Sequence, residues 1–148
     1  ILDVYYTDEH MEITEKEVPH VLIRNNVDVA IVESNNGGKG FARNIKAAIE
    51  KLKGRTIIKW FFQGKNKEAR ILTQASWIMN KLHFPTDWRQ RWHEYYIDMN
   101  KFQRKGKNKH DDAPDATTGL AEIIQAFINN TLDDKTTTKK ERRKVVRR

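Results

Sequence analysis

The chain has 148 residues, the usual length of a single domain with one hydrophobic core. Charged residues make up 32% of it and hydrophobic residues 38%, so we expect a modest core beneath a heavily charged surface. No apolar stretch approaches the roughly 18 residues of a membrane-spanning helix, and acids follow the first apolar run where a signal peptide would have its cleavage site. Because there is no cysteine, disulfides, thiolate metal sites and a cysteine nucleophile are excluded, and we expect a cytosolic protein.

The net charge of +8 indicates a polyanionic partner, and its distribution is uneven. Residues 131–148 hold eight Lys or Arg and three acids, which is five of the eight net charges. This tail is nearly free of apolar residues, so we expect it to be flexible, either as a nonspecific phosphate contact or as a solubilising terminus. A second basic cluster in the body leads directly into acidic residues and is the better candidate for binding nucleic acid: Lys101, Arg104, Lys105, Lys107 and Lys109.

The first half of the chain alternates between strand and helix patterns. Residues 1–7 are β-branched and aromatic and predict a strand, and residues 14–25 predict a helix. The nearly continuous apolar run 27–32 is typical of a strand covered on both faces. Apolar residues at helical spacing over 41–52 and a further strand pattern over 56–62 follow. This order predicts a parallel sheet with helical crossovers.

The second half is mainly helical by pattern. We expect one helix over residues 66–82 and another over 88–102, each from its apolar spacing. Residues 105–110 form a basic loop that contains a glycine. Pro114 suits the first turn of a helix, so Asp111 or Asp112 is the expected N-cap of a last helix that ends near Asn129.

Glu33 is the most informative single residue. It closes the apolar run 27–32 and precedes the turn Ser34–Gly38, and open α/β sheets bind ligands at the carboxyl ends of their strands. A charge buried there requires either an Arg or Lys partner or a divalent cation. Oxygen ligands without cysteine favour Mg²⁺ or Mn²⁺ over zinc.

The second acidic group lies at the start of the last helix. Asp111, Asp112 and Asp115 share one helix face, where their repulsion is unfavourable unless a cation lies between them. Together with Glu33 they can hold two Mg²⁺ ions roughly 3.5–4 Å apart, the spacing that activates a water and stabilises the leaving oxygen in phosphodiester cleavage. The structural alternative is a heavily capped, solvated helix end. His110 is either a proton relay beside the metal or an ordinary surface histidine.

Two segments resemble a known family. Ile31–Ile45 (IVESNNGGKGFARNI) and Gly106–Glu122 (GKNKHDDAPDATTGLAE) are similar to the second and third acidic motifs of the nuclease domain in the large terminase subunit of tailed bacteriophages. The similarity runs over nearly all of residues 1–130, while the basic tail 131–148 lies outside it. The resemblance implies an α/β fold of the ribonuclease H-like type, three-layered, with a mixed central sheet flanked by helices.

The resemblance also implies roles for the acids. In that family an Asp on the opening strand, an acid at a strand end and an Asp at a helix start bind two divalent metals. By resemblance Glu33 takes the second role and Asp112 with Asp115 the third, and Asp111 is a further candidate ligand. The first strand, with the first Asp, is expected upstream of Ile1, so the domain is expected to be N-terminally incomplete and this fragment inactive if that Asp is missing.

The resulting expectation is a Mg²⁺- or Mn²⁺-dependent endodeoxyribonuclease that cuts concatemeric viral DNA during packaging in the host cytoplasm. The basic cluster at residues 101–109 would contact the phosphates of double-stranded DNA. The resemblance implies an ATPase domain, a small terminase subunit and a portal as partners, and no membrane. Two alternatives stay open: a non-catalytic DNA-binding or portal-docking module of the same fold, and a nuclease of the resolvase or transposase type.

Overall fold

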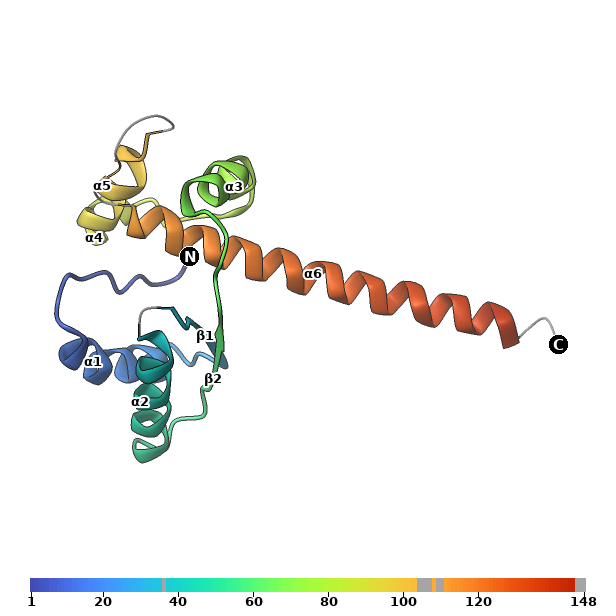
Figure 1. Cartoon of the computed structure of the whole chain (residues 1–148), viewed down its shortest axis with the longest axis horizontal. Coiled ribbons are helices and arrows are strands. Elements are labelled where there is room, and N and C mark those ends of the chain that lie inside the picture. Colours follow the sequence, from blue (N-terminus) through green and yellow to red (C-terminus); the bar gives the residue numbers. More distant parts are fainter. Residues whose placement is uncertain (36, 104–107, 109–110, 146–148) are drawn as a thin grey trace. The chain divides into compact units, whose positions relative to one another are not determined.

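The computed structural model describes residues 1–35, 37–103, 108 and 111–145, and the chain divides into two compact units, Ile1–Lys65 and Asn66–Arg148. The first unit is mixed α/β and the second is helical, so the predicted α/β class is confirmed. The first unit holds α1 (Met11–Arg24), β1 (Val29–Glu33), α2 (Gly38–Lys51) and β2 (Ile57–Phe61) (Figure 1). The second holds α3 (Lys67–Lys81), α4 (Trp88–Arg91), α5 (His93–Lys101) and α6 (Asp112–Val145).

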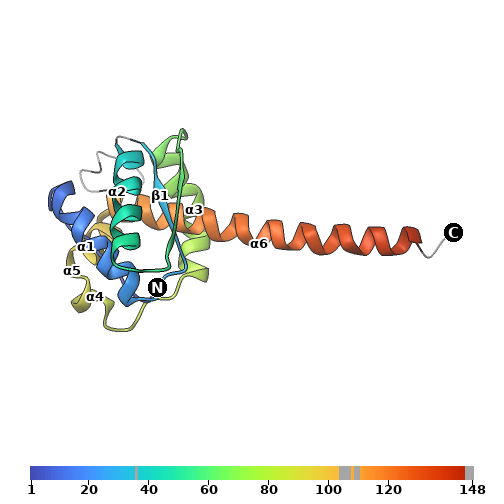
Figure 2. The ribbon, with the colours of Figure 1, turned by 90° about the horizontal axis from the view of Figure 1, so that it is seen from below.

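The sheet of the first unit is a parallel pair. β1 and β2 run side by side from Val29 opposite Ile57 to Glu33 opposite Phe61. Helix α2 connects them and lies beside both strands (Figure 2). The predicted parallel strand–helix–strand crossover is therefore confirmed.

The core of the first unit forms between α2 and one face of the sheet. Ala42, Ile45 and Ile49 are buried on one side of α2 and meet Ile58 of β2. They recur at intervals of three and four residues, the spacing that places side chains on one helix face. Half-buried residues of α1, β1 and α2 surround this cluster: Val18, Leu22, Ala30, Val32 and Phe41.

The opposite face of this sheet is exposed, so the prediction of a strand covered on both faces is wrong. β1 alternates between exposed and half-buried residues, and Val29, Ile31 and Ile57 are 41%, 39% and 57% exposed. The physical reason is that α1 and α2 both pack on the side of Ala30 and Val32. The apolar run 27–32 therefore predicted β1 correctly, but it did not predict that one face of this strand is exposed.

Residues 1–7 do not form the predicted strand; within the described residues the sheet consists of β1 and β2. The Asp3 carboxylate instead accepts hydrogen bonds from Asn25 at 2.8 Å and Arg24 at 3.2 Å, at the end of α1. The Asn25 bond, more than the Arg24 ion pair, holds the pKa of Asp3 below its usual value despite partial burial. Helix α1 begins at Met11, three residues before the predicted start at Thr14.

In the second unit, α3 and α5 both pack against α6. The predicted start of α3 is confirmed, because the Asn66 side chain caps it by accepting a hydrogen bond from the Ala69 amide at 3.0 Å. The buried Tyr95 hydroxyl of α5 bonds to Thr117 of α6. Burial raises the pKa of Tyr95, and the bond to Thr117 opposes that rise only in part.

Two helix boundaries differ from the sequence pattern. The helix predicted over 88–102 is broken at Trp92, whose φ of −131° and ψ of 62° are not helical and whose side chain is buried. Packing of this large ring overrides the local helical periodicity. Helix α6 continues beyond Asn129 to Val145, in a stretch without the Gly or Pro that would end it (Figure 1).

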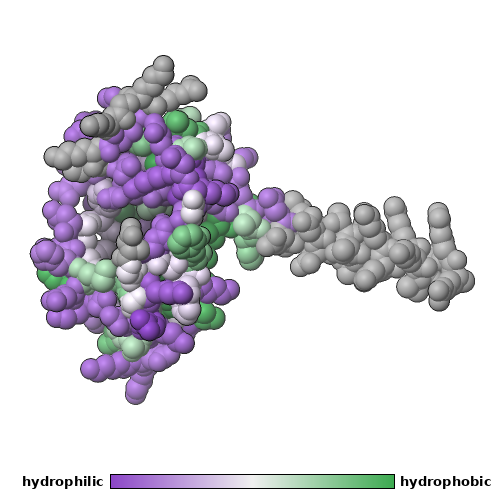
Figure 3. Space-filling view, viewed as in Figure 1, coloured by the Kyte–Doolittle hydropathy of each residue, from purple (hydrophilic) through white to green (hydrophobic). Residues whose placement is uncertain are grey.

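No helix in the part of the chain that the structure describes is long and apolar enough to cross a membrane. Hydrophilic residues dominate the face shown in Figure 3, as the charged composition predicts. Smaller apolar patches lie between them.

Candidate functional site

Glu33 lies at the carboxyl end of β1, opposite Phe61. The turn after it is tied to the end of β2. The Ser34 amide and hydroxyl both donate to the Phe61 carbonyl at 2.7 Å. The Asn35 side chain donates to the Gln63 carbonyl at 2.6 Å and accepts from the Gln63 amide at 3.2 Å. These four bonds fix the backbone that carries Glu33.

Two glycines bring α2 against the end of β1. Gly37 has a φ of 93°, a conformation that glycine adopts without strain. A Cβ atom on Gly38 would lie only 1.8 Å from the Glu33 carbonyl oxygen, so no larger residue fits there without movement of the backbone. The positive end of the α2 dipole therefore begins beside Glu33.

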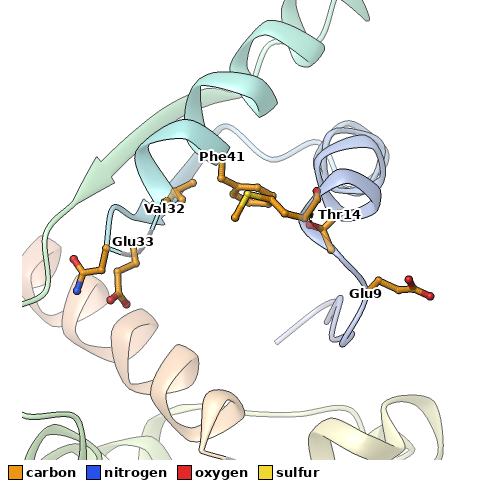
Figure 4. Close-up of a pocket in the computed structure, with 8 residues that line it drawn as sticks. Glu9, Thr14, Val32, Glu33 and Phe41 are labelled. Atoms are coloured by element: carbon orange, nitrogen blue, oxygen red, sulfur yellow. Dashed lines mark hydrogen bonds between the residues drawn. The ribbon is translucent and has the colours of Figure 1, made fainter.

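The Glu33 side chain is exposed, so the expectation of a buried charge that needs compensation is wrong. Among the described residues its carboxylate has no hydrogen-bond or ion-pair partner. It lines a cavity of about 380 Å³ whose centre is apolar, with Glu33 at one end and Glu9 at the other (Figure 4). The other lining residues are Met11, Thr14, Val32, Asn35, Gly38 and Phe41. An accessible, unpaired carboxylate of this kind is able to bind a cation.

The second acidic group surrounds the start of α6. Asp111 precedes the helix as its N-cap residue, and its carbonyl accepts the Asp115 amide at 3.0 Å. The Lys67 ammonium, on the first turn of α3, lies 2.7 Å from Asp111, 3.0 Å from Asp112 and 3.6 Å from Asp115. The cation that the sequence required between these acids is therefore present, and the chain itself supplies it.

Two opposing effects act on Lys67. Its partial burial disfavours the charged form, whereas the hydrogen bonds to Asp111 and Asp112 favour it. The acids outweigh the burial and raise the pKa of Lys67 well above its ordinary value. The side chain consequently remains a cation throughout the physiological pH range.

Arg70 forms a second, deeper ion-pair group one turn along α3. Its side chain is only 5% exposed, and it donates to Asp115 at 2.8 Å and to Glu122 at 2.9 Å and 3.2 Å. Such a buried guanidinium is tolerated because carboxylates satisfy it on both sides. A bond of 2.6 Å between Gln74 and Gln125 continues the same row. We call this row the polar seam; it holds α3 against α6 and joins Lys67, Arg70 and Gln74 of α3 to Asp111, Asp112, Asp115, Glu122 and Gln125.

Sequence reasoning missed Lys67, Arg70 and Glu122. The spacing gave a partial signal, because Asp115 and Glu122 are seven residues apart and Lys67 and Arg70 are three apart, so each pair shares a helix face. Nothing in the local pattern showed that these two faces meet. Among the described residues, no three His, Asp or Glu side chains are already arranged to hold a metal ion.

The predicted phosphate-binding cluster is described only at its edges. Lys101 is exposed at the end of α5, while Arg104, Lys105, Lys107, Lys109 and His110 lie outside the described residues. The Gln103 amide donates to the Asn108 side chain at 2.8 Å, and that side chain donates back to the Gln103 carbonyl at 3.0 Å. These two bonds bring the flanks of the basic segment together.

Comparisons of this chain with protein-family models, with curated proteins and with solved structures found no match.

Replacing Gly38 with Ala is expected to lower the free energy of unfolding by about 1–3 kcal/mol, because the new methyl group overlaps the Glu33 carbonyl. Gly40→Ala is the matched control, since a Cβ there meets nothing within 4 Å. In a helix the control should be neutral or stabilising by up to about 1 kcal/mol. Urea unfolding of both variants measures the difference; equal midpoints would contradict the tight approach of α2 to β1.

Proposed function

We propose that this chain is a metal-dependent DNA endonuclease domain with a ribonuclease H-like fold, of the type in the large terminase subunit of tailed bacteriophages. The observation that supports it most is the charge balance of the polar seam. Four carboxylates and two cations meet there: Asp111, Asp112, Asp115 and Glu122 with Lys67 and Arg70. Carboxylates this close together favour an additional cation.

The available donors fit a hard divalent cation. Glu33 is exposed and unpaired among the described residues, and Asp112 is 82% exposed on its side chain. Carboxylate oxygens without thiolates favour Mg²⁺ or Mn²⁺. Glu33, Asp112 and Asp115 would hold the metal ions, with Asp111 as a further ligand. When bound, a metal pair supplies an activated water and stabilises the leaving oxygen of a phosphodiester.

The basic residues have the complementary task of bringing a phosphate to a site that would otherwise repel it. The basic residues precede the acids directly in the chain: Lys101, Arg104, Lys105, Lys107 and Lys109. Positive charge next to the carboxylates attracts the DNA backbone irrespective of sequence. His110 lies between both groups in the chain and would serve as a proton relay there.

The same proposal extends to the setting of the reaction. The substrate would be concatemeric double-stranded DNA in the host cytoplasm. An ATPase domain, a small terminase subunit and a portal would be the partners of the complete packaging machine.

One observation favours a second function. Lys67 and Arg70 already pair with the acids of α6, and a purely structural seam needs no metal. The chain would then be a non-catalytic module that grips DNA or docks to the portal. Cutting, rather than binding, distinguishes these two functions.

With Mg²⁺ or Mn²⁺ the protein is expected to nick supercoiled plasmid DNA, and Glu33→Gln and Asp112→Asn are each expected to reduce the rate by about a hundredfold or more, since each removes a charged metal ligand. Asp28→Asn is the control, because Asp28 is an exposed acid that precedes the opposite end of β1. Agarose gels follow the conversion. DNA binding without nicking in either metal would instead favour the non-catalytic module.

Neutralising the five basic residues to Gln is expected to weaken DNA binding equally for unrelated sequences and to reduce the salt slope by up to about 4.5, since each phosphate contact contributes about 0.9. Fluorescence anisotropy at several salt concentrations measures both quantities. The control variant should change the slope far less. It replaces five exposed basic residues of the first unit with Gln: Lys16, Lys46, Lys51, Lys53 and Arg55. An equal effect of both variants would show that only net charge matters.

A further inference from the structure

Lys67 lies among the acids of α6 to which the proposed function assigns a metal ion. We propose that the Lys67 ammonium is an exchangeable resident cation: it neutralises Asp111, Asp112 and Asp115 while the site is free of metal, and a divalent cation must displace it to bind there. The inference rests on the proposed function, because it concerns the regulation of the same site.

The geometry supports competition for the same oxygens. The ammonium is 2.7 Å from one oxygen of Asp111 and 3.0 Å from one oxygen of Asp112, with Asp115 at 3.6 Å. A metal coordinated by these oxygens and an ammonium hydrogen-bonded to them exclude one another. A doubly charged ion in place of a singly charged one would also neutralise more of the negative charge of Asp111, Asp112 and Asp115.

The two cations of α3 differ in how readily they can leave. Arg70 is 5% exposed and binds Glu122 with two nitrogens, so its removal would take a charged partner from two half-buried acids, Asp115 and Glu122. The Lys67 side chain is 36% exposed and ends in a single ammonium on a flexible stem. Arg70 therefore holds α3 on α6, whereas Lys67 can swing outward without separating the helices. Once released, its ammonium is available to a DNA phosphate.

Lys67→Met tests the competition, because it keeps an unbranched side chain and removes the charge. We expect this variant to bind Mn²⁺ about tenfold or more tightly than the wild type, since the native site is open only while the ammonium is away. We also expect a lower melting temperature in EDTA that recovers as Mn²⁺ is added. Lys67→Arg and Lys81→Met, the latter at the other end of α3, should bind Mn²⁺ like the wild type. Calorimetric titration gives the affinities.

A second measurement uses the wild-type protein and does not depend on the folding of a variant. Acetylation of lysines, read residue by residue by mass spectrometry, should be slow at Lys67 without metal and faster with Mn²⁺, while Lys81 stays unchanged. Equal Mn²⁺ affinity of Lys67→Met and wild type, or unchanged labelling of Lys67 at saturating Mn²⁺, would overturn the proposal.

The outcomes separate this inference from the function on which it rests. If Mn²⁺ binds in a way that Asp112→Asn abolishes but Lys67 labelling does not respond, only the exchange is wrong. If no Mn²⁺ binding depends on Asp112, both the metal site and the exchange are wrong. If Mn²⁺ displaces Lys67 but the protein does not nick plasmid DNA, the exchange of cations is supported and the nuclease function is wrong.

Discussion

Carboxylates that crowd together at a helix start require positive partners, and this requirement organises the second unit. The nearly buried Arg70 guanidinium donates hydrogen bonds to Asp115 and to Glu122. One turn earlier on α3, the Lys67 ammonium pairs with Asp111, Asp112 and Asp115. Removing Arg70 would take away the guanidinium that the half-buried carboxylates of Asp115 and Glu122 share. The polar seam therefore fixes α3 against α6, and the hydrogen bond between the Tyr95 and Thr117 hydroxyls adds α5 to the same helix.

The polar seam also determines whether its acids are able to bind a metal ion. Carboxylates whose oxygens all bonded to arginine would only stabilise the fold. Here the ammonium of Lys67 is partly exposed and Asp112 faces solvent. In the first unit Ser34, Asn35 and the glycine turn hold the backbone around Glu33, and its carboxylate is exposed and has no hydrogen-bond partner in the part of the chain that the structure describes. Fixed backbone with accessible charge is what a metal-binding site needs from its scaffold.

The elements that the sequence predicted well are those set by local chemistry. The crossover from β1 through α2 to β2, the start of α3 after Asn66 and the start of α6 at Asp112 follow from periodicity, turn residues and capping. The failures concern partners that are distant in the chain. Residues 1–7 have strand-like composition, but a strand also needs a neighbour, and Asp3 bonds to the end of α1 instead. The apolar run before Glu33 did not reveal that both helices cover the same face of the sheet.

In the candidate site, too, local features were predictable and contacts between distant segments were not. Residue type and spacing identified Glu33, Asp111, Asp112 and Asp115. They did not identify Lys67 and Arg70, because the sequence of one helix does not show which face of another helix it will pair with. Glu122 lay at the end of a recognised motif without an assigned role. Spacing can show that acids need a cation, but it cannot show whether a metal or a lysine meets that need.

The proposed function requires that Glu33 and the acids of α6 bind the same pair of metal ions. Fe²⁺ in place of Mg²⁺, with ascorbate and peroxide, generates radicals that cut the backbone beside its ligands, and the fragments can be mapped by mass spectrometry. We expect cuts in two regions, around Glu33 and around residues 111–115, both suppressed by excess Mg²⁺ and both lost in Asp112→Asn. Cuts confined to one region, or cuts around Glu33 that persist in Asp112→Asn, would show that these acids do not share a metal site.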